Sequence, residues 1–194
     1  VTAKLLEVVD MGEMKGLVFD TTTFYGESGG QVGDIGAVKD GKNVIAHIDD
    51  TQKPGDGLYV HFSSDADALE GGKSYTLAVD GHTRKLIMRN HSATHLLQSA
   101  LIKVLGPHVK QAGSVVTAEK LRFDFAHTQA MTKEEIQKVE DIVNAEISKS
   151  LKVEANIMDM AAAQKKGAMA LFGEKYGNIV RVLTMGEFST ELCG

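Results

Sequence analysis

The feature that most constrains the fold is a change of hydrophobic period near residue 82. Before it, short alternating runs predict strands, and the turn sequences DGKN, KPGDG and EGGK separate them. After it, apolar residues recur at helical spacing up to Gly106-Pro107, which ends the helix. The strand-like runs are GLVFD, GAVKD, NVIAHIDD, LYVHF and SYTLAVD. The chain is therefore expected to be α+β.

The two parts are expected to differ in architecture. Residues 1–81 predict a small β-barrel subdomain, because short strands at this spacing are typical of small barrels. Residues 82–194 predict a mixed α/β subdomain with a sheet packed against helices. Its expected elements are strands within 114–127 and at 179–185, a helix capped by Thr132 and Glu135, and a short helix near 159–166. The capped helix presents one apolar face, formed by Ile136, Val139, Ile142, Val143 and Ile147.

Composition excludes several classes of protein. The net charge of −5 provides no global basic field, so contact with nucleic acid would have to be local, such as one end of a folded RNA. An apolar run of membrane-spanning length is absent from the sequence. The single cysteine, Cys193, excludes an internal disulfide and fits a reducing, cytoplasmic setting. A chain that starts without Met and ends in TELCG is expected to be a fragment.

Two histidines, His91 and His95, lie four residues apart on the predicted helix, in NHSATHLL. At this spacing both imidazoles project from one helix face, close enough to share one Zn²⁺. They could equally be two ordinary polar residues at the start of a helix. Residue 92 is Ser, so the water-activating glutamate of an HExxH protease is absent.

Zinc takes four protein ligands in a structural site, or three and an open position in a catalytic one. Cys193 would be a third ligand, although a free cysteine is also often just a small buried residue. His108 and His127 are further candidate ligands.

The glycine-rich stretch 21–36, TTTFYGESGGQVGDIG, lacks the G-x-G-x-x-G spacing and precedes a strand. Phosphate binding at a helix N-terminus is therefore unsupported here. One interpretation is a tight turn whose glycines supply positive φ. The other is a substrate loop, whose backbone a ligand approaches closely at Gly29 and Gly30. The polar groups of such a loop would come from Thr22, Thr23, Ser28 and Gln31.

Taken together, several segments resemble motifs of the editing domain of the alanyl-tRNA synthetase family, in the family's order. FYGESGGQVGDIG is similar to its glycine-rich motif and NHSATHLL to its HxxxH zinc motif. HVKQAGSVV and LRFDFAH are similar to the segments that follow, and GAMALFGEKYG and VRVLTMGEFSTELCG to the approach to its CxxxH motif. The resemblance covers nearly the whole chain. Freestanding editing proteins typically carry prolines in the glycine loop where this chain has Gly26 and Val32, which favours a piece of a full synthetase.

In that family HxxxH and CxxxH together bind one Zn²⁺, so the resemblance implies His91, His95 and Cys193 as ligands. The fourth, four positions past the cysteine, would lie beyond Gly194, which would leave a weaker, open zinc site here. The zinc could polarise the ester carbonyl, orient the substrate or activate water.

The resemblance further implies hydrolysis of the ester that joins serine or glycine to the acceptor end of tRNA(Ala). An alanine pocket cannot exclude glycine and rejects one added hydroxyl only weakly, so a second, hydrolytic site is needed. Thr22, Thr23, Thr94 and Gln111 are candidates for sensing the serine hydroxyl, and Thr94 and Gln111 are the catalytic candidates among them. Water is expected to attack the ester directly, because no Ser-His-Asp or Cys-His arrangement is visible.

The expected partners are the tRNA(Ala) acceptor end and the other domains of the same synthetase, which would carry ATP use and aminoacylation. Two alternatives stay open: a freestanding trans-editing deacylase, and a non-catalytic, zinc-stabilised module that only holds the acceptor stem. Four basic residues could meet phosphates or be solvated surface charges: Arg84, Lys85, Arg89 and Arg122.

Overall fold

The computed structural model describes residues 1–55, 57–168 and 177–193. The chain divides into two compact units, the first comprising Val1–Met88 and Thr117–Glu119, the second Arg89–Val116 and Lys120–Gly194. Both units combine strands with helical segments, which confirms the α+β class. The predicted division of the chain into domains at residues 81 and 82 stays a prediction.

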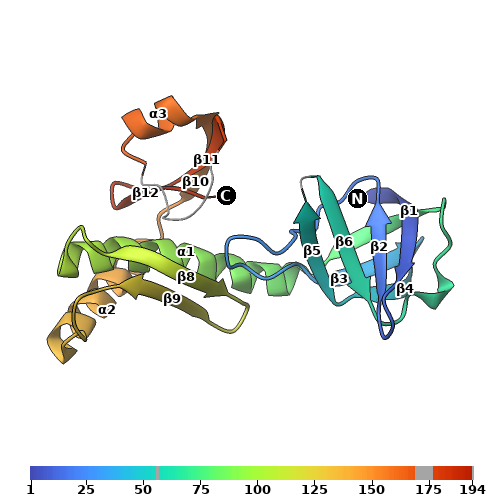
Figure 1. Cartoon of the computed structure of the whole chain (residues 1–194), viewed down its shortest axis with the longest axis horizontal. Coiled ribbons are helices and arrows are strands. Elements are labelled where there is room, and N and C mark those ends of the chain that lie inside the picture. The colour runs from blue at the N-terminus through green and yellow to red at the C-terminus, as the bar shows by residue number, and fades with distance from the viewer. Residues whose placement is uncertain (56, 169–176, 194) are drawn as a thin grey trace. The chain divides into compact units, whose positions relative to one another are not determined.

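The first unit contains one antiparallel sheet of seven strands in the order β4-β3-β7-β1-β2-β6-β5 (blue to green in Figure 1). The strands are β1 (Thr2–Asp10), β2 (Lys15–Phe19), β3 (Gly36–Asp40), β4 (Asn43–Ile48), β5 (Asp50–Gly55), β6 (Leu58–Ser63) and β7 (Ser74–Val79), and a short 3-10 helix, η1 (Ala66–Ala68), precedes β7. Five of these strands, β2, β3, β4, β6 and β7, overlap the runs that the sequence indicated. β1 and β5 were not predicted, because β1 lacks strict alternation and β5 ends within the expected turn KPGDG.

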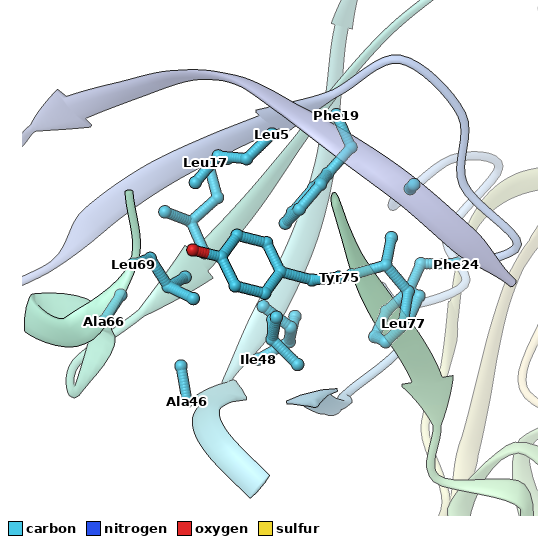
Figure 2. Packing of buried hydrophobic residues seen from close by; sticks show 12 residues of the cluster. Leu5, Leu17, Phe19, Phe24, Ala46, Ile48, Ala66, Leu69, Tyr75 and Leu77 are labelled. Carbon is cyan, nitrogen blue, oxygen red and sulfur yellow. The ribbon is translucent and has the colours of Figure 1, made fainter. Parts of the chain in front are cut away.

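The sheet surrounds a core drawn from most of its strands. Leu5, Leu17, Val38 and Leu77 each expose 2% or less of their surface, and they come from β1, β2, β3 and β7. The ring of Tyr75 belongs to the same cluster and lies among the side chains of Leu17, Ile48 and Leu69 (Figure 2). The Tyr75 hydroxyl accepts a hydrogen bond from the backbone N–H of Glu70 at 2.9 Å, so the one polar atom of this side chain is satisfied.

The barrel expected for this unit does not close. β4 and β5 form the two edges of the sheet, and no pairing joins them within the described residues. Only Asp49 separates the two strands along the chain. A hairpin normally needs a loop of at least two residues, so β4 and β5 cannot fold back on each other as antiparallel neighbours.

A buried histidine, His61 on β6, packs edge-on against Phe19 and Phe24, with ring centroids 5.3 Å away in each case. Its Nδ1 lies 3.1 Å from the carbonyl oxygen of Leu17 and its Nε2 2.8 Å from the hydroxyl of Thr22. A carbonyl can only accept, so Nδ1 carries the proton and Nε2 accepts from Thr22. Burial lowers the pKa of His61 below its usual value, which keeps this imidazole neutral.

We expect the contribution of His61 to stability to weaken as pH falls. The unfolded chain protonates this histidine near pH 6.5 and the folded chain only at lower pH, so protonation favours unfolding. The difference in unfolding free energy between wild type and His61→Gln should therefore change between pH 7.5 and 5.5. The wild type should lose up to about 1.4 kcal/mol per pH unit relative to the variant. Urea unfolding at several pH values measures this, and a constant difference would contradict it.

The second unit is built on α1 (Gly81–Leu105), which begins in the first unit and continues into the second. The carboxylate of Asp80 accepts from the backbone N–H groups of His82 and Thr83, as an N-cap does. Gly106, at φ +112°, ends the helix, as its sequence indicated.

In its described residues, the rest of the second unit forms two small sheets and two helices (Figure 1). β8 (Lys110–Val116) pairs with β9 (Leu121–Ala126), and β10 (Val153–Asp159), β11 (Ile179–Met185) and β12 (Ser189–Leu192) form an antiparallel sheet in that order. The helices are α2 (Lys133–Ser148) and α3 (Met160–Lys165). One core joins α1 and α2 with Phe123 and Phe125 of β9, and another joins α3 to β11 and β12.

Several predictions for this unit are confirmed. The capping box of Thr132 and Glu135 is present, and α3 and β11 occupy the predicted segments. On the apolar face of α2, however, only Val139 is buried, whereas Ile136 and Ile147 near the helix ends are exposed. β10 and β12 were not predicted. The segment GAMALFGEKYG falls largely on residues 169–176, outside the described part of the chain.

Candidate metal centre

His91 and His95 lie one turn apart on α1, inside the second unit. Their rings are stacked, with centroids 5.1 Å apart and planes inclined by 19°. His95 is buried and His91 is half-buried. The helical spacing predicted from sequence therefore does bring the two imidazoles together on one face.

Cys193 directly follows β12 and reaches the same place. Its backbone N–H donates to the carbonyl of Arg181 on β11 at 2.9 Å, which holds it beside the sheet. Its sulfur lies 3.3 Å from Nε2 of His91, and the ligand atoms of His91, His95 and Cys193 all lie within 4.8 Å of one another. A guanidinium nitrogen of Arg181 donates to the same sulfur at 3.6 Å. Three residues predicted as ligands thus form one cluster.

The environment of the cluster favours charge separation. Burial disfavours a thiolate, but the neighbouring His91 and His95 outweigh burial and lower the pKa of Cys193 to about 6. Burial likewise disfavours an imidazolium, but the Cys193 sulfur and the carboxylate of Glu191 outweigh it and raise the pKa of His95 to about 9. Near neutral pH the metal-free cluster therefore holds a thiolate beside a protonated imidazole. A cation bound here would replace that proton.

The residues of the cluster fit Zn²⁺. One sulfur and two imidazole nitrogens form a donor set typical of zinc sites. Nε2 of His95 is buried and faces the Cys193 sulfur, so an ion bound there would replace the proton of this nitrogen. Three ligands leave the fourth position of a tetrahedral ion to water, substrate or another protein group.

The other two candidate histidines contact each other instead. Nε2 of His108 lies 2.8 Å from Nδ1 of His127, and their rings are stacked with centroids 5.0 Å apart. Within the described residues, neither belongs to a group of three potential metal ligands.

The glycine-rich stretch lies in the first unit, and residues 28–31 form a tight turn. Ser28 and Gln31 exchange backbone hydrogen bonds of 3.2 and 3.0 Å, and Gly29 and Gly30 both have positive φ, +58° and +82°. Two consecutive positive φ values are what a type I′ turn requires, which accounts for this glycine pair. The conformation thus favours the tight-turn interpretation.

Two further glycines of the stretch permit close backbone approach within the fold. A Cβ at Gly33 would lie 2.1 Å from the carbonyl oxygen of Thr51, and one at Gly36 would lie 2.2 Å from that of Ala78. Both glycines are therefore required by neighbouring strands, whether or not a ligand binds nearby.

The threonines of the stretch take part in internal hydrogen bonds. The Thr22 hydroxyl donates to His61, as described, and accepts from the N–H of Phe24 at 3.0 Å. The backbone carbonyl of Thr23 accepts from Arg84 at 2.6 Å, and Arg84 also forms an ion pair with the buried carboxylate of Asp34. Of the basic residues considered for phosphate contact, Arg84 therefore stabilises the glycine-rich stretch, and Arg122 pairs with Asp124 at 3.0 Å.

The two catalytic candidates lie in the second unit, as the metal cluster does. Thr94 is buried on α1, and its hydroxyl donates to the carbonyl of Asn90 at 2.9 Å, so it can only accept from a ligand. Gln111 lies half-buried on β8, opposite Phe125, next to a bulge in the β8–β9 pair.

Comparison with known families adds a finding about the first unit. Residues 1–83 match the family model of class II tRNA synthetases (A). This match agrees with the resemblance to alanyl-tRNA synthetase and indicates a tRNA-related enzyme with tRNA as its partner. It covers fewer than half of the 194 residues and does not include the metal cluster. In the described part of the chain, no helix is long and apolar enough to cross a membrane.

Several residues that support the glycine-rich stretch and the candidate metal centre were not predicted from the sequence. His61 and Asp34 stabilise the glycine-rich stretch, and Glu191 with Ser99 and Ser189 supports His95 of the candidate metal centre. The sequence did contain a signal for the residues around His95. Ser189, Glu191 and Cys193 alternate as residues on one side of a strand do, and Ser99 continues the four-residue spacing of His91 and His95.

Proposed function

We propose that this chain is an editing domain of an alanine-tRNA ligase, which hydrolyses the ester of serine or glycine mischarged onto tRNA(Ala). The observation that carries the proposal is the convergence of His91, His95 and Cys193, which come from opposite ends of the second unit's sequence. The synthetase match over residues 1–83 supports the same assignment independently.

The donor set suits zinc, which would supply Lewis acidity at the substrate's ester or fix its orientation. In the proposed mechanism His91, His95 and Cys193 bind the ion, and water attacks the ester directly. Cys193 cannot serve as a nucleophile while it is a metal ligand. No covalent intermediate is therefore expected.

Thr94 and Gln111 are proposed to recognise the amino acid. The Thr94 hydroxyl has its proton committed to Asn90, so it offers a lone pair to the hydroxyl of a seryl ester. The Gln111 amide offers both a donor and an acceptor. Alanine would leave such groups unpaired, which would spare correctly charged tRNA. Thr22, Thr23, Ser28, Gly29, Gly30 and Gln31 stay proposed contacts to the substrate.

A deacylation assay tests the function. The zinc-loaded chain should accelerate loss of serine from Ser-tRNA(Ala), and the double substitution His91→Ala with His95→Ala should abolish the acceleration. His108→Ala is the matched control, because this histidine lies outside the cluster, and it should keep the activity. Gln111→Ala should lower the rate on the seryl ester.

The outcomes separate the alternatives. Binding of tRNA(Ala) without acceleration would support a non-catalytic module that holds the acceptor stem and would refute the hydrolase. The reading frame upstream of Val1 distinguishes a synthetase domain from a freestanding deacylase, because a synthetase would encode an ATP-dependent catalytic domain there.

A further inference from the structure

A buried carboxylate, that of Glu191, lies against the metal cluster without belonging to it. Glu191 exposes 0% of its surface, and its Oε2 lies 2.5 Å from Nδ1 of His95. Its other oxygen, Oε1, accepts from the hydroxyls of Ser99 at 3.1 Å and Ser189 at 2.8 Å. A buried carboxylate is tolerated only when its oxygens have donors, and both oxygens of Glu191 have them.

The position of Glu191 follows from the spacing of residues along β12 and α1. Along β12 and its end, Ser189, Glu191 and Cys193 alternate and so face one side of the sheet, whereas Leu192 packs into the core on the other side. Along α1, His91, His95 and Ser99 recur every four residues and so share one helix face. Cys193 meets His91, and Glu191 meets both His95 and Ser99.

This arrangement determines which nitrogen of His95 can bind a metal. An ionised carboxylate only accepts hydrogen bonds, so Nδ1 of His95 carries a proton and donates it to Glu191. When the imidazole is neutral, its lone pair therefore lies on Nε2. That atom is buried and faces the Cys193 sulfur, on the side of the candidate metal ligands.

We propose that Glu191 is the positioning residue of the metal centre. It holds the His95 ring in one orientation, with Nδ1 protonated and Nε2 available to the ion, and Ser99 and Ser189 hold Glu191 in turn. Glu191 does not itself bind the metal or the substrate. The inference rests on the metal site of the proposed function but not on hydrolysis of an ester.

Zinc affinity of the whole chain tests the inference, measured by competition with a chelating dye. Glu191→Gln keeps the shape of the side chain but removes its charge and one acceptor oxygen, so zinc should bind about 10- to 100-fold more weakly. Glu187→Gln is the matched control, because it removes the same charge from an exposed glutamate nearby and should leave affinity unchanged. Equal affinities for the two variants would overturn the proposal.

The serines provide a second comparison. Ser99→Ala and Ser189→Ala should each weaken zinc binding by roughly two- to tenfold, because each removes one hydrogen bond to the charged Glu191. In the Glu191→Gln background, Ser99→Ala should add little further loss, because it acts through Glu191. Full additivity of the two losses would contradict this chain of contacts.

A measurement on the unmodified chain keeps the proposal testable if a variant fails to fold. Nitrogen-15 NMR of the zinc-loaded protein should show His95 protonated at Nδ1 and coordinated through Nε2, whereas coordination through Nδ1 would refute the proposal. Failure of the proposed function is distinguishable, because a chain can show these zinc effects and still leave Ser-tRNA(Ala) intact.

Discussion

Replacing Cys193 by serine is expected to weaken zinc binding by roughly 10²- to 10⁴-fold. The substitution nearly preserves shape but exchanges a thiolate for a neutral hydroxyl, a much poorer zinc ligand. Losing one of three ligands should remove a quarter to a third of a binding free energy on the order of 10–16 kcal/mol. Competition with a chelating dye gives the affinity, and measured metal content gives the stoichiometry.

The same substitution should remove the stabilisation of the fold by zinc. At a free zinc concentration of 100 times Kd, the wild type should gain about 2.7 kcal/mol of unfolding free energy, and Cys193→Ser should gain almost none at that concentration. His108→Ala is the control and should retain the full gain, because His108 contacts His127 rather than the cluster. A Cys193→Ser chain that zinc stabilises as strongly as the wild type would refute the assignment of this ligand.

Replacing Gly33 by alanine is expected to destabilise the first unit by about 3 kcal/mol. The new Cβ would lie 2.1 Å from the carbonyl oxygen of Thr51 and 2.8 Å from its nitrogen. Both are backbone atoms, so the clash cannot be relieved by rotating a side chain, and the backbone at Gly33 must move away from β5. Urea unfolding of the whole chain measures the loss.

Gly71→Ala is the matched control in the same unit. The space around Gly71 is open and its φ is not positive, so alanine there should change stability by less than about 1 kcal/mol. If Gly33→Ala unfolds like the control, the glycine is not required by the fold. Interaction with a substrate would then be the better account of it.

Local pattern was sufficient for much of the fold. The capping box at Thr132 and Glu135, the helix end at Gly106 and the strand Ile179–Met185 all follow from interactions among residues close in sequence. The local pattern did not predict the elements that depend on pairing with other strands. β1 and β12 are strands because neighbouring strands complete their hydrogen bonds, and the open sheet of the first unit depends on which strands meet.

In the candidate metal centre too, the local pattern predicts some residues and only the fold reveals others. The four-residue spacing of His91 and His95 already predicts a shared helix face, and the resemblance in motif order adds Cys193. The alternation of Ser189, Glu191 and Cys193 could not by itself pair Glu191 with His95, because these two residues lie 96 positions apart along the chain.

By itself, then, the sequence determined an α+β chain with a helix that presents two histidines, because helical spacing is a property of neighbouring residues. Only the tertiary structure decided that Cys193 lies 3.3 Å from His91, that Glu191 accepts hydrogen bonds from His95 and Ser99, and that Thr22 pairs with His61. These contacts join residues 102, 96 and 39 positions apart, and they depend on how whole elements pack. Packing is set by the combined burial of many side chains, which no local stretch specifies.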